Sequence, residues 1–152
     1  MALSETTIHA RICDHLKLHY PEAVFKSFKE DGRKRHVTDQ KLFKRMHSGP
    51  GFPDIFVFEP RAGYHGLGIE VKRDGVTIKK KDGNLVADKQ IRIEALMHHT
   101  LGTRGYLCYF GVGFDHAIQI LTEYMALPKP NYTPPEFDYK LPEPEADDGP
   151  VF

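Results

Sequence analysis

The stretch GFPDIFVFEPRAGYHGLGIEVK, residues 51–72, decides how this chain folds. Its two apolar runs, residues 55–58 and 67–71, have the length and the side chains that are typical of β-strands. Ala62 and Gly63 lie between the runs and are suited to a tight turn. The stretch therefore predicts a β-hairpin with its turn near residue 62.

The position of this turn predicts which residues face each other. In an antiparallel hairpin centred on Ala62, Asp54 lies opposite Glu70. Directly opposed carboxylates destabilise a sheet, so the pair needs a counter-charge, and a divalent cation is the strongest one available. Lys72 follows Glu70 by two residues and so projects from the same face of the strand. The sequence thus predicts two acids and an ammonium group at one end of the hairpin.

This combination of side chains suits hydrolysis of a phosphodiester bond. Oxygen atoms of Asp54, Glu70 and the Val71 carbonyl could hold Mg²⁺ or Mn²⁺, which would polarise a phosphate and lower the pKa of a bound water. Lys72 would orient that water or stabilise the developing negative charge. The simpler alternative is a Glu–Lys pair on a solvated sheet face. Apolar residues on both faces of the hairpin argue against it, because they predict a covered sheet.

Helical periodicity appears in three other segments. The first helix is expected to begin after Ser4, a capping residue, and to end near Tyr20. The second covers residues 93–101 with Gly102 just beyond its end, and the third covers residues 114–125. The positions that this spacing predicts to face the core are Ile8, Ile12, Leu16, Ile93, Leu96, Met97, Thr100, Leu101, Phe114, Ala117, Ile118, Leu121, Tyr124 and Met125.

Two more segments are typical of strands, a short one over residues 23–28 and a buried one over residues 105–110. Residues 30–46 are polar and receive no assignment, and residues 79–84 are expected to form a charged, solvent-exposed turn. The order of helix, strands, helix, strand and helix predicts an α/β fold in which helices pack on a small mixed sheet.

Composition divides the chain near residue 127. The 152 residues suffice for one domain with a proper core. Residues 128–152 hold seven of the eleven prolines and six acids, which predicts an extended, acidic, proline-rich tail after a domain over residues 1–127. The whole chain has 21 bases and 21 acids, so the domain without this tail is mildly basic.

The densest positive stretch is residues 26–45. A solvated loop is the simpler interpretation of such a stretch taken alone. Beside a site for phosphodiester hydrolysis we interpret it as a segment that contacts DNA phosphates. The candidate DNA-binding residues are Lys26, Lys29, Arg33, Lys34, Arg35, Lys41, Lys44, Arg45 and, next to Lys72, Arg73.

Several classes of protein are excluded. Cys13 and Cys108 stand far apart, so neither a disulfide framework nor a CxxC zinc site is expected, and both are predicted to be buried thiols. No run of 18 apolar residues is present, and residues 1–7 are polar and acidic, which predicts neither a membrane span nor a secretory signal. We therefore expect a cytoplasmic protein with no membrane partner and no organic cofactor.

Pro53-Asp54, a spacer, and Glu70-Val71-Lys72 resemble the signature of the PD-(D/E)XK nuclease superfamily. With the surrounding GFPDIF, GYHGL, KDGNL, RGY and GFDHA segments, the region from about residue 5 to residue 127 is similar to the VRR-NUC branch, particularly its small stand-alone phage-type members. The resemblance implies a restriction-endonuclease-like fold, a four-stranded mixed sheet flanked by helices. It also implies a divalent metal and cleavage of DNA, often branched DNA such as Holliday junctions, by a homodimer. The corresponding location is the cytosol of a bacterium or of a phage-infected host.

The resemblance also implies two supporting residues. The family's acid on the first helix falls on Glu5, where it would complete the metal site, although compensation of the helix dipole explains such an acid equally well. The family carries a glutamine on the helix after the EVK strand. Residue type favours Gln90, whereas counting back from the RGY segment gives Glu94, and both share one helix face.

The sequence as a whole predicts an endonuclease that depends on Mg²⁺ or Mn²⁺, with Asp54, Glu70, Lys72 and Gln90 as catalytic residues. The first alternative is a catalytically inactive DNA-binding or assembly module with the same fold. The intact Asp, Glu and Lys set favours the enzyme. The second alternative is a small protein-interaction factor that acts through the acidic tail.

Overall fold

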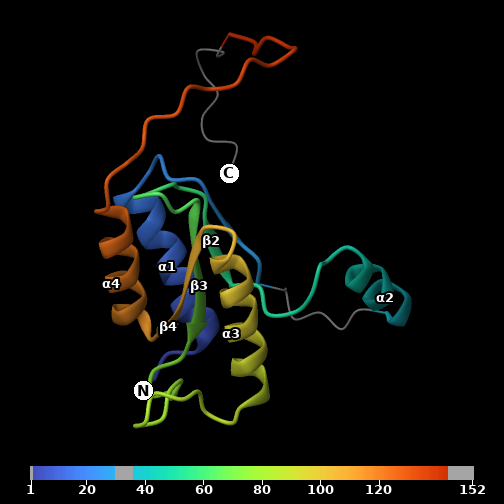
Figure 1. The fold of residues 1–152 in the computed structure, drawn as a ribbon, viewed down its shortest axis with the longest axis vertical. Helices are drawn as coiled ribbons and strands as arrows, with labels where there is room; N and C mark the ends of the chain where they lie inside the picture. Colours follow the sequence, from blue (N-terminus) through green and yellow to red (C-terminus); the bar gives the residue numbers. More distant parts are fainter. Residues whose placement is uncertain (1, 30–35, 144–152) are drawn as a thin grey trace.

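Strand β3 (Gly66–Lys72) runs through a four-stranded mixed sheet, and every one of its residues is buried. In the computed structural model, which describes residues 2–29 and 36–143, helices cover both faces of this sheet (Figure 1). The strand order is β1-β2-β3-β4, antiparallel except for the parallel pair β3–β4. This arrangement confirms the predicted fold class. The remaining elements are α1 (Glu5–His19), β1 (Phe25–Ser27), α2 (Val37–Arg45), β2 (Ile55–Val57), α3 (Lys89–Gly102), β4 (Tyr106–Val112) and α4 (Phe114–Met125).

Strands β2 and β3 form the predicted hairpin in the predicted register. Ile55 pairs with Ile69, and the ladder continues in step towards the turn. Ala62 (φ 49°) and Gly63 (φ 87°) make the turn in the left-handed region, which glycine adopts without strain. Because side chains alternate along a strand, the odd-numbered residues of the hairpin face one side and Glu70 faces the other.

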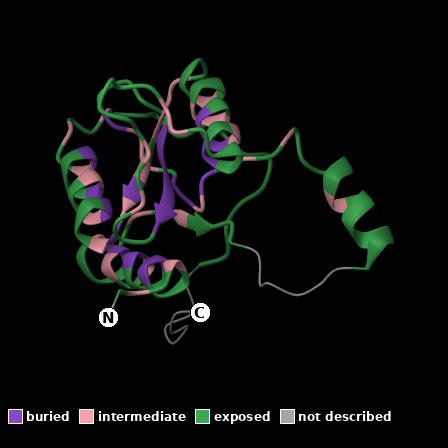
Figure 2. Cartoon of the chain, turned by 90° about the horizontal axis from the view of Figure 1, so that it is seen from below, coloured by how far each residue is buried: buried purple, intermediate pink, exposed green. Residues whose placement is uncertain are grey.

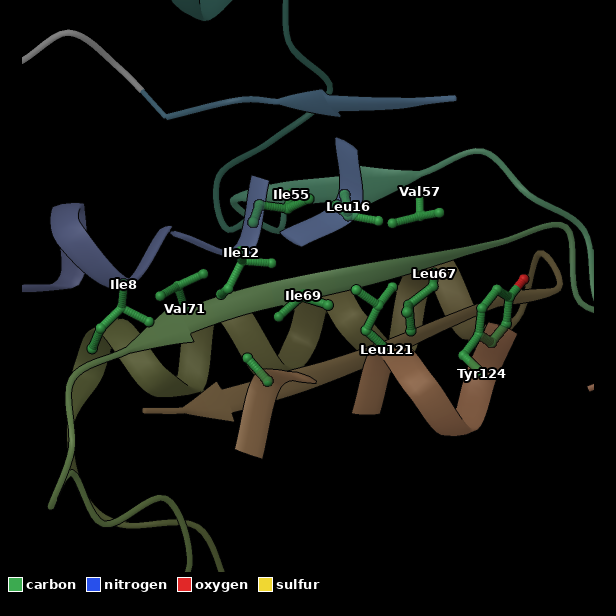
Figure 3. Close-up of a cluster of buried hydrophobic side chains, with 11 residues drawn as sticks. Ile8, Ile12, Leu16, Ile55, Val57, Leu67, Ile69, Val71, Leu121 and Tyr124 are labelled. Carbon is green, nitrogen blue, oxygen red and sulfur yellow. The ribbon is translucent and has the colours of Figure 1, made fainter. Parts of the chain in front are cut away.

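The odd-numbered face carries the hydrophobic core. Helices α1 and α4 cover this face, and Figure 3 shows their apolar side chains interleaved with those of β2 and β3. Ser4 begins α1 as predicted, because its side chain accepts a hydrogen bond from the Thr7 N–H at 3.1 Å. The buried core consists of Ile8, Ile12, Leu16, Ile55, Val57, Leu67, Ile69, Val71, Ala117, Leu121 and Tyr124.

Helix α3 covers the opposite face, and the stripe predicted to face inward is wrong in part: Leu96 and Thr100 are exposed, whereas its other members are half-buried. Leu96 is 70% exposed, whereas the buried residues of α3 are Ile91, Glu94 and Ala95. The spacing of apolar residues did not predict the buried face of α3 correctly, because one buried position, Glu94, carries a carboxylate. The helix also includes Gly102, which was expected to lie just beyond its end.

Strand β4 is half exposed rather than buried as predicted. It lies at the edge of the sheet and pairs only with β3, so one side of its backbone has no partner strand in the described sheet. Tyr109 in its centre is 44% exposed. The apolar composition of residues 105–110 predicts the strand correctly but does not distinguish an edge from a centre.

Helix α2 stands away from the sheet (Figure 1), within the stretch that received no assignment. None of its residues is buried, and Figure 2 shows the helix almost wholly in the exposed class. Most helices in globular proteins are stabilised by packing of an apolar face, which is also what makes them visible in a sequence. This helix lacks such a face against the core.

After α4 the described residues 126–143 contain no helix or strand, and the chain leaves the fold from the end of that helix (Figure 1). Both cysteines are free and partly buried; burial raises the pKa of Cys108 to about 11. None of the described helices combines the length and the apolar character that crossing a membrane would need.

Candidate active site

Asp54 lies immediately before β2 and reaches across to β3. Its Oδ2 accepts a hydrogen bond from the Val71 N–H at 2.9 Å. On its other side, the Asp54 backbone carbonyl accepts a hydrogen bond from the Phe28 N–H at 2.7 Å. The residue is therefore held between the two neighbouring strands, with its carboxylate at the edge where Glu70 lies, as the register predicted.

The carbonyl of Val71 lies at the same edge. In an extended strand the N–H and C=O of one residue point to the same side, so this carbonyl faces the Asp54 side. If the ladder continued for two more residues, the residue opposite Val71 would be Pro53, which has no N–H to donate. The next carbonyl, that of Lys72, points the other way and accepts from the Gly113 N–H at 2.8 Å. The described sheet therefore offers the Val71 carbonyl no ladder donor.

Glu70, Lys72 and Glu94 form a buried cluster of charges between β3 and α3. Each of them is at most 9% exposed. Lys72 Nζ donates to Glu94 Oε1 at 2.9 Å and to Glu70 Oε1 at 3.3 Å. It also lies 2.8 Å from Glu94 Oε2, an ion-pair distance without the geometry of a hydrogen bond. Lys72 thus connects the two carboxylates.

Gln90 lies at the outer side of this cluster. Its Nε2 donates to Glu94 Oε1 at 3.0 Å, one helical turn away. Gln90 and Glu94 were the two candidates for the supporting residue on this helix. Glu94 contacts Lys72 directly, whereas Gln90 contacts only Glu94 among the charged residues of the cluster. The geometry makes Glu94 the central residue of α3 and Gln90 its support.

Burial has opposite consequences for the two ends of the Glu70–Lys72 pair. Burial, and then the negative charges of Asp54 and Glu94, raise the pKa of Glu70 to about 9. Burial alone would lower the pKa of Lys72, but its contacts with Glu94 and Glu70 outweigh this and raise the pKa above the ordinary value. At neutral pH Lys72 is thus a cation, whereas Glu70 favours the protonated form unless another positive charge is close.

The donor set fits a small divalent cation. Carboxylate and carbonyl oxygens are the ligands that Mg²⁺ and Mn²⁺ prefer, and Asp54, Glu70 and the Val71 carbonyl supply them. A cation there would counteract the burial and the repulsion that raise the pKa of Glu70. Within residues 2–29 and 36–143, no three His, Cys, Asp or Glu side chains form a ready-made metal site. Water and phosphate oxygens would therefore complete the coordination.

Helix α1 brings His9 close to the site, a residue that the sequence analysis missed. His9 is 4% exposed, and its Nε2 lies 2.7 Å from the Ser27 hydroxyl on β1. Burial lowers the pKa of His9, partly opposed by the charge of Asp54. Its position next to Ile8 in the buried stripe was the available signal. Glu5 is the first residue of α1 and makes no described hydrogen bond or ion pair with the site.

Two glycines allow the segment before β2 to pack closely. A Cβ on Gly51, which has φ 90°, would lie 2.8 Å from the Ile93 carbonyl of α3. A Cβ on Gly68 would lie 2.6 Å from Cγ of Pro53. The backbone at Gly51 thus lies directly against α3, and the Pro53 ring lies directly against β3, so both contacts position the segment that leads into Asp54.

The candidate DNA-binding residues do not form one continuous surface. Lys26 lies on β1 and Lys29 just after it, whereas the bases of the second half of the stretch lie on the α2 arm. Arg73 is exposed directly after Lys72. The three bases in the middle of the stretch lie outside the described residues. The residues on α2 are Lys41, Lys44 and Arg45, and the residues outside the described part are Arg33, Lys34 and Arg35.

Comparison with known proteins finds no matching family model and no significant match among curated proteins. Three solved chains do match in structure. One, described as "VRR_NUC domain protein", has 25% sequence identity and a TM-score of 0.58, and the match covers 85% of this chain and 93% of the other.

A second match, described as "VRR_NUC domain", has 19% identity and a TM-score of 0.42 over 77% of this chain and 97% of the other. The first match covers most of both chains and shows that the two share a fold. Together with the hairpin register and the meeting of Asp54, Glu70 and Lys72, this similarity supports a VRR-NUC-like domain with a nuclease-type fold.

Proposed function

We propose that this protein is a metal-dependent endonuclease that hydrolyses phosphodiester bonds of DNA. The observation that carries the proposal is the meeting of Asp54 and Glu70 at the edge of two strands, with the Lys72 ammonium held beside them. The nuclease-type fold of the VRR-NUC family supports the class of reaction.

Each residue of the site has a part in this reaction. Asp54, Glu70 and the Val71 carbonyl would hold Mg²⁺ or Mn²⁺, which when bound polarises the phosphate and acidifies a water molecule. Lys72 donates hydrogen bonds to the attacking water or to a phosphate oxygen, because it stays protonated between two carboxylates. Glu94 positions Lys72, and Gln90 supports Glu94 from the outside.

DNA would be held by the basic residues around the site. Lys26 and Lys29 lie on the side of Asp54, and Arg73 directly follows the catalytic strand. The α2 arm, with three exposed bases, extends from the segment that leads into β2 (Figure 1). Such contacts release counterions, so the affinity for DNA should fall steeply as salt concentration rises.

The proposed substrate is branched DNA, including Holliday junctions, and the proposed active form is a homodimer in the cytosol. The resemblance to small phage-type VRR-NUC proteins supports both. A two-fold symmetric dimer would present two copies of the site, as cleavage of two strands at one junction requires.

The test is a digest of linear, flapped and four-way-junction DNA, run in parallel with Mg²⁺, Mn²⁺ and EDTA. We expect metal-dependent products from the wild-type protein and at least a roughly 10²-fold lower rate from Lys72→Ala. Lys17→Ala, an exposed lysine in the last turn of α1, is the matched control and should cleave at the wild-type rate.

A wild-type protein that binds these DNAs but cleaves none of them with either metal would contradict the proposal. That result would favour the alternative, a catalytically inactive DNA-binding or assembly module with the same fold.

A further inference from the structure

A second, smaller hairpin connects β3 to α3, and we call residues 78–86 the basic hairpin. Backbone hydrogen bonds join its two arms, and Gly83 (φ 85°) makes the turn. The segment is therefore an ordered projection of the fold. Its backbone contacts are Val86 N–H to the Ile78 carbonyl at 3.0 Å, Lys80 N–H to the Asn84 carbonyl at 2.8 Å, and the bridge between Lys79 and Leu85.

The tip of the basic hairpin carries three lysines and one acid, so positive charge is in excess there. Lys79, Lys80 and Lys81 are consecutive and exposed, and none makes an ion pair within the described part of the chain. The acid beside them, Asp82, accepts a hydrogen bond from the Asn84 N–H at 3.0 Å and is committed to the turn. One carboxylate offsets only part of the repulsion among three ammonium groups, and a bound anion would offset more of it.

Helix α3 adds a fourth cation to this surface. Arg92 Nε donates to the Val86 carbonyl at 3.2 Å, which fixes the guanidinium against the basic hairpin. Its two terminal nitrogens have no acceptor among the described residues. A shallow, open depression lies here, lined by Lys80, Gly83, Asn84, Leu85 and Arg92. The surface is thus open and basic.

The basic hairpin lies at the same end of the sheet as the acidic site. It begins six residues after Lys72, the last residue of β3, and leads into the first turns of α3, which carry Gln90 and Glu94. Figure 1 shows it at the end of the fold where β3 ends and where α1 and α4 begin. The acidic tail leaves from the opposite end of α4 (Figure 1).

We propose that the basic hairpin and Arg92 bind the phosphate backbone of the DNA substrate, as a surface separate from residues 26–45. The inference rests on the proposed nuclease function. A DNA backbone that crosses the acidic site would contact the basic hairpin on the α3 side. On the β1 and β2 side it would contact Lys26 and Lys29. Lysine and arginine contacts of this kind hold DNA in place without reading its sequence.

The test measures DNA affinity as a function of salt concentration, in EDTA so that no cleavage occurs. The variant Lys79→Gln/Lys80→Gln/Lys81→Gln should bind more weakly, and the slope of log affinity against log salt should become shallower by about 0.9 for each lost contact. Arg92→Gln should have the same effect with one contact. With metal and saturating DNA, both variants should cleave at the wild-type maximal rate, because no residue of the acidic cluster has changed.

The matched control is Lys17→Gln/Lys129→Gln/Lys140→Gln, which removes the same charge from exposed positions elsewhere. If this control weakens binding as much as the hairpin variant, the effect is one of net charge and the inference is wrong. It is also wrong if the hairpin variants keep the wild-type affinity and slope while the wild-type protein binds and cleaves; the proposed function then stands. A wild-type protein that neither binds nor cleaves DNA would instead overturn the proposed function, and this inference with it.

Discussion

The ring of Pro53 rests directly on Gly68, two positions before Glu70 on β3. A Cβ at position 68 would come within 2.6 Å of Pro53 Cγ and 3.0 Å of Cys108 Sγ. Position 68 therefore accepts only a residue without a side chain while Pro53 keeps its place. Since Asp54 follows Pro53, this contact sets the distance between the two acidic residues of the site.

Gly68→Ala should displace Pro53 and with it the Asp54 carboxylate. A misplacement of about 1 Å can lower an enzymatic rate roughly 10²-fold, and we expect a loss of that size in cleavage. Gly102→Ala is the control, because a Cβ there meets nothing within 4 Å. It should leave cleavage unchanged and stabilise α3 by up to about 1 kcal/mol. Normal cleavage by a folded Gly68→Ala protein would show that the Pro53 contact does not position Asp54.

Glu94→Ala should lower cleavage by roughly 10-fold to 10²-fold, because Lys72 loses the carboxylate that holds it. Glu94→Gln should retain most of the activity, since an amide oxygen can still accept from the ammonium. Gln90→Ala should cost less than Glu94→Ala, because Gln90 reaches Lys72 only through Glu94. Steady-state kinetics with the three variants decides between the two candidates, and a larger loss in Gln90→Ala would reverse their roles.

Without a divalent cation, the protein should lose stability as pH rises from about 5 to about 9. Burial and the charges of Asp54 and Glu94 raise the pKa of folded Glu70 to about 9, from an ordinary value of 4.5. Between these values the folded state binds more protons than the unfolded state, so the free energy of unfolding falls with pH. Urea denaturation in EDTA measures it.

Glu70→Gln cannot ionise, so its stability should change less over the same pH range and exceed that of the wild type at the alkaline end. Adding Mn²⁺ should restore wild-type stability at high pH, because the cation replaces the proton. Parallel stability curves for wild type and Glu70→Gln in EDTA would show that Glu70 ionises normally.

Charge reversal of Arg33, Lys34 and Arg35 should weaken DNA binding and leave Mn²⁺ binding intact. These bases belong to the stretch that we propose contacts DNA phosphates, whereas the oxygen ligands of the site lie just before β2 and on β3. Fluorescence anisotropy with labelled DNA measures the first quantity and calorimetry with Mn²⁺ the second. Unchanged DNA affinity would remove these three residues from the proposed interface.

Deletion of residues 130–152 should leave cleavage intact, because the proposed domain ends near residue 127. The truncation keeps Pro128, whose carbonyl accepts a hydrogen bond from the Ala62 N–H at 2.9 Å in the hairpin turn. Increased cleavage after truncation would show that the acidic tail competes with DNA. If the truncated protein folds but no longer cleaves DNA, residues of the tail are needed for cleavage.

The core and the acidic pair could be predicted because local rules determine both. The turn at Ala62 fixes the register, and the register alone brings Asp54 to the edge where Glu70 lies. The stripe of Ile8, Ile12 and Leu16 on α1 is regular because every member packs on the same sheet face.

The remaining features depend on contacts that periodicity does not record. The inner face of α3 could not be predicted from apolar spacing, because Glu94 is buried by an ion pair with Lys72 rather than by apolar packing. His9 was missed because burial of a histidine depends on its partner, here Ser27 on a strand 18 residues away. Helix α2 has no buried residue, so nothing in its sequence ties it to the core.

Pro53 has no amide hydrogen, and this affects the pairing of β2 with β3. Any other residue at this position would have an N–H that could donate to the Val71 carbonyl. The two strands of the hairpin could then pair as far as residues 53 and 71. The place proposed for catalysis is therefore the gap left by an unfinished ladder. A substitution such as Pro53→Ala would therefore add one backbone hydrogen bond to the hairpin and lower the proposed catalytic activity.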